Sequence, residues 1–138
     1  MDINLKNQYN ENYHRHGYWE EKYTSGLIES TGYYENGVKV GQWVEYWNSG
    51  GVSFVGTYVN GKRDGYWESY WRNGETHFKA YYKNGEKHGY WEELIFNGLL
   101  MHKGNYDNGL RIGLHVFGKN QEFTSKNFII EEFYCIVM

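Results

Sequence analysis

Apolar and polar residues alternate along most of the chain, and clusters of Asn and Gly interrupt the alternation at regular intervals. In a typical stretch, residues 43–47 and 52–59 alternate with a period of two, whereas 48–51 and 60–65 are rich in Asn, Ser and Gly. A period of two is typical of β-strands, and Asn and Gly tolerate the positive φ angles of tight turns between antiparallel strands. The pattern therefore predicts a unit of two strands and two turns.

This unit recurs every 24 residues, with Gly-x-Trp at 17–19, 41–43, 65–67 and 89–91. Positions 24 residues apart form columns: all six Trp fall in two columns and most Gly in four. We therefore expect a single repeat domain over 1–138, in which 1–16 is a degenerate N-terminal unit, 17–112 are four repeats, and 113–138 are a partial repeat and C-terminal cap. The predicted fold is all-β, an elongated, twisted antiparallel meander of about nine strands.

A symmetric hairpin around the 48–51 loop predicts the strand register. It pairs Trp47 with Val52 and Trp43 with Gly56. An indole over a small cross-strand neighbour fills the space that the missing side chain leaves, so Trp43 is expected to lie over Gly56. The same rule joins Trp19 to Gly32, Trp67 to Ala80 and Trp91 to Gly104. Closing the next connection over 60–65 places Tyr58 beside Trp67, and one face of the sheet becomes aromatic while the other is mixed and polar.

The C-terminal segment 125–138 leaves two interpretations open. Its polar residues fall on one helical stripe, which favours a capping helix. Its β-branched and aromatic content favours a strand. In either form the segment is expected to cover the open edge of the last hairpin.

Composition and charge narrow the classes of protein. The 138 residues include 15 Tyr, 7 Phe and 6 Trp but few Leu or Ala, which excludes a helical bundle. The formal net charge of −3 argues against general nucleic-acid binding. A single Cys, a polar N-terminus and the lack of a long apolar run predict a cytoplasmic protein without an intrachain disulfide.

Residues 54–65 (Phe-Val-Gly-Thr-Tyr-Val-Asn-Gly-Lys-Arg-Asp-Gly) resemble the MORN repeat, whose pattern is Tyr-x-Gly-x-aromatic-x-Asn-Gly-Lys-x-x-Gly. Residues 30–37 and 102–109 match it with a substituted first aromatic, and 78–80 depart at the Gly. The Gly-x-Trp-x-x-Tyr insertion is similar to the bacterial and phage variant, which includes proteins described as antitoxin-like. The resemblance covers about 17–118. It implies a β-hairpin sheet and an interaction module, with lipid binding, scaffolding or dimerisation in different members and no catalytic residues.

The first candidate site is one column that is basic in every row, which we call the basic row. Its members are Arg15, Lys39, Arg63, Lys87 and Arg111. At equivalent turn positions they should line one edge, about 9–10 Å apart, as a rail for an acidic surface or phosphates. The alternative is that they are solubilising charges, stacked on neighbouring aromatics or paired with Glu20, Glu68 and Glu92.

The second candidate is the aromatic face. The inner tryptophan column (Trp19, Trp43, Trp67 and Trp91) is expected to be core. The outer aromatic column lies nearer the hairpin loops and is the more exposed half, suited to binding a peptide or helix of another protein. It consists of Tyr23, Trp47, Trp71 and Ile95.

Signals for catalysis or metal binding are weak. His14 and His16 have the spacing of neighbours on one strand face but no evident third ligand, and Cys135 lies in an apolar segment without a base. We therefore predict no catalytic residues, no metal, no cofactor and no enzymatic activity.

The sequence predicts a non-catalytic protein-binding module, and its resemblance implies an inhibitor or antitoxin-like protein. The alternative is a peripheral phospholipid- or phosphate-binding module that uses the basic row, and self-association is a third hypothesis. Salt distinguishes the first two, because binding through the basic row should weaken steeply with ionic strength.

Overall fold

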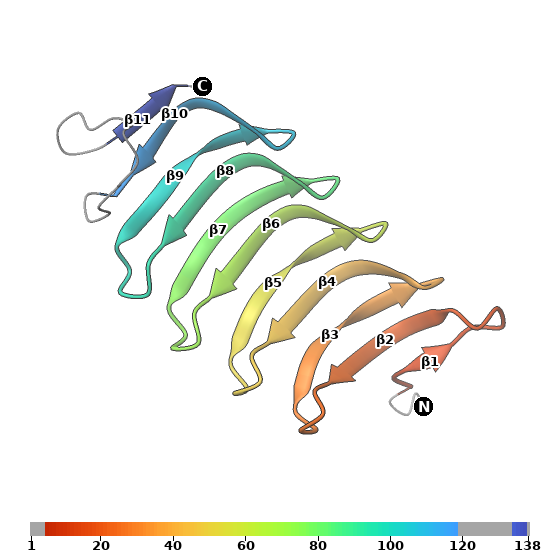
Figure 1. Cartoon of the computed structure of the whole chain (residues 1–138). Helices are drawn as coiled ribbons and strands as arrows, with labels where there is room; N and C mark the ends of the chain where they lie inside the picture. Colours follow the sequence, from red (N-terminus) through yellow and green to blue (C-terminus); the bar gives the residue numbers. More distant parts are fainter. Residues whose placement is uncertain (1–4, 119–133, 138) are drawn as a thin grey trace.

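The structure is a computed structural model that describes residues 5–118, and residues 134–137 by their backbone. The described strands form one antiparallel sheet of eleven strands in chain order (Figure 1). The all-β meander is confirmed, and β1 and β11 extend it beyond the nine strands expected. The strands are β1 (Gln8–Tyr9), β2 (Arg15–Lys22), β3 (Ile28–Glu35), β4 (Val38–Tyr46), β5 (Val52–Val59), β6 (Lys62–Tyr70), β7 (Thr76–Lys83), β8 (Glu86–Leu94), β9 (Leu100–Asp107), β10 (Leu110–Phe117) and β11 (Tyr134–Val137).

Tight two-residue turns connect one set of neighbouring strands. Between β5 and β6, Asn60 and Gly61 have φ angles of 49° and 78°, and Val59 pairs with Lys62. Positive φ at both central residues gives a twist that matches that of the strands. The expected connection over 60–65 is therefore too long: Gly65 lies within β6, where the register shifts.

The wider loops contain a bulge that the symmetric hairpin did not anticipate. Tyr46, and not Trp47, pairs with Val52, and the register shifts before Glu45 pairs with Phe54. Ser53 is the extra residue of this bulge. Because two residues of the bulged strand face one residue of its partner, the alternation of faces is broken here. Ser53 is therefore buried beside Phe54, although strict alternation places it on the opposite face.

The predicted cross-strand pair of Trp43 and Gly56 is present, but the indole covers a different glycine. Gly56 pairs with Trp43 on one side and with Trp67 on the other. Trp67 is the ring that lies over Gly56, since a Cβ built on Gly56 would lie 2.1 Å from Trp67 Cδ2; Trp43 likewise covers Gly32. The register shift next to Gly56 interrupts the ladder, and the carbonyl of Thr57 accepts the indole N–H of Trp67 at 3.1 Å. Trp43 and Trp67 thus each cover the glycine of the preceding strand.

The aromatic face forms its own core. The rings of Tyr34 and Trp43 meet edge-to-face at 5.0 Å, and those of Tyr58 and Trp67 at 5.1 Å, so the predicted contact of Tyr58 with Trp67 is confirmed. Such pairs contribute about 0.5–1.5 kcal/mol each beyond the area that they bury. All four indoles of the inner tryptophan column are buried, and Trp67 is 0% exposed.

The C-terminal residues that the structure describes form a strand. Residues 134–137 are β11, which pairs antiparallel with β10. The helical interpretation of 125–138 is therefore wrong for these four residues, where the free backbone groups of β10 and a β-branched, aromatic sequence favour pairing. Residues 125–133 lie outside the described part of the chain. Among the described residues there is no helix long and apolar enough to cross a membrane.

Candidate functional site

Every member of the basic row lies over an aromatic ring. The guanidinium of Arg15 is 4.6 Å from the ring centroid of Trp19, and that of Arg63 is 4.5 Å from Trp67. The ammonium groups of Lys39 and Lys87 lie 4.2 Å and 3.7 Å from Trp43 and Trp91, and Arg111 lies 5.8 Å from Phe117. Cations are attracted to the negative face of aromatic rings, most strongly to that of Trp.

The basic row is therefore part of the aromatic face and does not form a separate edge. All of its members are half-buried except Arg111, which is exposed. Arg15 also pairs with Glu21, whereas Glu20 pairs with Lys6 at 2.6 Å. Aromatic stacking, one of the two structural explanations for this row, is thus present in every unit.

The outer aromatic column links neighbouring hairpins. Trp47 Nε1 donates to the carbonyl of Tyr70 and Trp71 Nε1 to that of Leu94, both at 3.2 Å, while the hydroxyl of Tyr23 donates to Tyr46 O at 2.6 Å. These side chains and Ile95 are half-buried, and are thus more exposed than the inner tryptophan column. Each hydrogen bond joins residues 23 positions apart, and this orders the wider loops.

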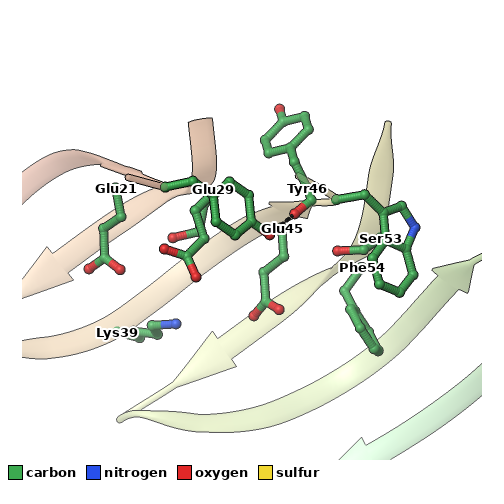
Figure 2. A pocket seen from close by; sticks show the side chains of 10 residues that line it. Glu21, Glu29, Lys39, Glu45, Tyr46, Ser53 and Phe54 are labelled. Atoms are coloured by element: carbon green, nitrogen blue, oxygen red, sulfur yellow. Dashed lines mark hydrogen bonds between the residues drawn. The ribbon is translucent and has the colours of Figure 1, made fainter. Parts of the chain in front are cut away.

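A depression of about 340 Å³ opens on the aromatic face between the outer aromatic column and the basic row (Figure 2). We call it the β2–β5 depression, because β2 to β5 and their wider loops supply its walls. Three carboxylates and the ammonium of Lys39 surround it, together with aromatic rings and two serines. Its lining residues are Glu21, Tyr23, Glu29, Ser30, Lys39, Glu45, Tyr46, Trp47, Ser53 and Phe54.

The opposite face carries exposed tyrosines that the sequence analysis did not single out as a candidate site. Tyr33 is 53% exposed, Tyr66 and Tyr81 pair at 5.3 Å between ring centroids, and Tyr90 is also exposed. Burial by neighbours and, secondarily, Glu68 and Glu92 raise the pKa of Tyr66 and of Tyr90 to about 12, so both hydroxyls stay protonated. The sequence does contain a signal for these exposed tyrosines, since three of the Gly-x-Trp motifs have Tyr at the middle position.

His115 takes the place of the tryptophan in the last repeat. It lies over Gly104, donates from Nε2 to Asn105 O at 2.8 Å, and is 0% exposed. The Nε2 atom of His102 lies 2.8 Å from Nδ1 of His115, so the two rings share a hydrogen bond. Burial, then His115 and the cations of Arg111 and Lys87, lower the pKa of His102 to about 4.

The weaker candidates show no reactive arrangement in the described part of the chain. No group of three or more His, Cys, Asp or Glu among the described residues could hold a metal ion. His14 is exposed, and His16 Nδ1 accepts from the backbone N–H of Asn36 at 3.3 Å. Cys135 lies in β11, whose side chains are outside the described part.

Comparisons with known proteins assign no family. No family model matches the sequence, and no curated protein matches it.

Proposed function

We propose that this chain is a non-catalytic, cytoplasmic protein-binding module that inhibits its partner by covering a working surface, in the manner of antitoxin-like proteins. It binds through the aromatic face, where the basic row and the outer aromatic column lie. The resemblance to MORN repeats supports the class of protein.

The observation that carries this proposal is the single-layer sheet with one ring-stacked cation per repeat. No described strand covers the aromatic face, because all the described strands belong to one sheet (Figure 1). Lys39 and Lys87 form no ion pair with any described residue, so their charges are available to acidic groups of a partner.

This surface is suited to binding because it is already ordered. Lys39 and Lys87 are each held against a buried indole, and Trp47 and Trp71 are held by hydrogen bonds to the next hairpin. Side chains that are ordered before binding lose less conformational entropy when the complex forms. The complementary partner surface is acidic opposite the basic row and apolar opposite the outer aromatic column.

The test is affinity capture from the native host with the intact chain, followed by mass spectrometry and titration of the captured protein. A double variant, Lys39→Gln with Lys87→Gln, should weaken binding about tenfold or more. Its matched control is Lys79→Gln with Lys103→Gln, which removes the same charge from the opposite face and should leave affinity unchanged.

The same variants distinguish the lipid alternative. A peripheral lipid-binding module is supported if no protein is captured and the chain sediments with phosphatidylserine vesicles but not with phosphatidylcholine vesicles. Such sedimentation should be lost as the salt concentration rises. Equal loss of protein binding in both double variants contradicts binding through the aromatic face. A concentration-dependent mass of the isolated chain in light scattering identifies self-association.

A further inference from the structure

The β2–β5 depression exists because one repeat lacks a ring that the others have. Position 30 is Ser, whereas the equivalent positions carry Phe54, Phe78 and His102. The rings of Phe54 and Phe78 pack at 5.8 Å and fill this part of the face in the following repeats. At Ser30 the row of rings ends and leaves a gap against Phe54.

Acidic groups accumulate around the same gap. Glu29 and Glu45 form no ion pair with any described residue, while Glu21 is held by Arg15. One repeat later the positions of Glu29 and Glu45 are Ser53 and Ser69, so the gap and the charge occur together. Figure 2 shows Glu21, Glu29 and Glu45 around the depression, with Lys39 as the cation that lines it.

Two largely buried serines line the depression, and their hydroxyl groups have no partner in the described part of the chain. Ser30 and Ser53 are each 5% exposed, and neither side chain forms a hydrogen bond with any residue that the structure describes. Figure 2 shows the hydroxyl of Ser53 directed into the depression. Neither oxygen is fully enclosed, so a hydrogen-bond donor that enters the depression can reach both of them.

We propose that the β2–β5 depression binds an arginine side chain of the protein partner. A guanidinium is planar, stacks on aromatic rings and donates to carboxylates and hydroxyls at once. The rings of Phe54 and Trp47, the carboxylates of Glu29 and Glu45 and the serine hydroxyls match those properties. This molecule already holds a guanidinium against the same row, since Arg63 lies 5.5 Å from the ring of Phe54.

This inference rests on the proposed function for the source of the arginine, but the depression can be tested alone. The probe is the peptide acetyl-Gly-Arg-Gly-amide, titrated into the intact chain and followed by ¹H–¹⁵N NMR. We expect saturable shifts of the Trp47 indole N–H and the Ser53 amide. The same peptide with citrulline in place of arginine should bind at least about tenfold more weakly, because citrulline is nearly isosteric but neutral.

Three variants identify the site. Ser30→Phe restores the ring of the other repeats and should abolish the shifts, and Glu29→Gln with Glu45→Gln should weaken binding about tenfold while keeping the shape. Glu35→Gln with Glu86→Gln removes the same charge from exposed positions outside the depression and should change nothing. Equal binding of the arginine and citrulline peptides, or full binding by Ser30→Phe, overturns the proposal.

Failure of this inference and failure of the proposed function give different results. If the captured partner binds wild type and Ser30→Phe equally, the arginine site is wrong and the protein-binding function stands. If the arginine peptide binds in the depression but no protein is captured, the site stands and the proposed function fails.

Discussion

Trp67 and Trp91 occupy equivalent positions one repeat apart, yet their indoles lie differently. Trp67 lies over Gly56 and donates its N–H to Thr57 O. Trp91 faces Ala80, stacks on Phe78 with 4.8 Å between ring centroids, and buries an N–H without a partner among the described residues. The single Cβ at position 80 occupies the space that the indole takes at Gly56. One methyl group per repeat therefore decides whether the ring crosses the strand.

The last repeat supplies a third form of the contact. His115 lies over Gly104 and donates to Asn105 O, as Trp67 does over Gly56. A smaller ring thus retains both the close approach and the hydrogen bond, whereas Trp91 loses the hydrogen bond opposite Ala80. The comparison indicates that the glycine, more than the identity of the ring, sets this geometry.

The largest expected effect on stability comes from removing the indole of Trp67, which lies over Gly56. Trp67→Ala should lower the free energy of unfolding by about 3–5 kcal/mol, because it leaves a cavity where a fully buried ring had packed. Trp91→Ala should have a smaller effect, since it also removes an unpaired buried donor. Urea denaturation measures both. An equal or greater effect of Trp91→Ala contradicts the comparison, and lost partner binding without lost stability would make Trp67 a binding residue.

A methyl group added to the central repeat tests the same contact from the other strand. Gly56→Ala should destabilise the fold by about 2–3 kcal/mol, because the indole of Trp67 must move and lose its hydrogen bond. Gly51→Ala is the matched control, since a Cβ there meets nothing within 4 Å. Thermal unfolding should separate the two variants clearly; equal melting temperatures contradict the steric explanation.

The histidine form of the contact should be sensitive to acid. The pKa of His102 is lowered from 6.5 to about 4 in the folded protein, so protons bind the unfolded chain more readily. Stability is fully present above about pH 6.5 and falls as the pH drops toward 4, by about 2 kcal/mol at pH 5. Urea denaturation across this pH range measures the loss. His102→Phe, which copies Phe78, should flatten the profile, and an unchanged slope would contradict the assignment.

The smallest effect is expected from removing the methyl group at the third repeat. Ala80→Gly should let Trp91 move over the strand and donate its N–H to Tyr81 O, as Trp67 does to Thr57. The gained hydrogen bond and the lost burial and backbone rigidity nearly cancel, so stability should change by less than about 1 kcal/mol. Slower hydrogen exchange of the Trp91 indole N–H is the signature, and its absence would show that Ala80 does not set the ring position.

The repetition of a few residue types was enough to predict much of this molecule. Gly-x-Trp and Asn-Gly at intervals of 24 residues indicate alternating strands and turns, and period-two alternation identifies the aromatic face. Predicted pairs such as Trp43 with Gly56 and Tyr58 with Trp67 are present because local hairpin geometry determines them. The basic row was also evident, since it depends only on which residues share a column.

Tertiary structure decided which neighbour each side chain meets. The bulges at Ser53 and before Trp67 shift the register, and only they place Ser53 in a depression and Trp67 over the preceding glycine. Bulges depend on how a strand pairs with both of its neighbours at once, which alternation along one strand does not encode. The amino-acid sequence by itself therefore determined the repeat, the fold class and the two faces. Packing across strands decided the contacts of each indole, the ring over which each cation lies, and the gap beside Ser30.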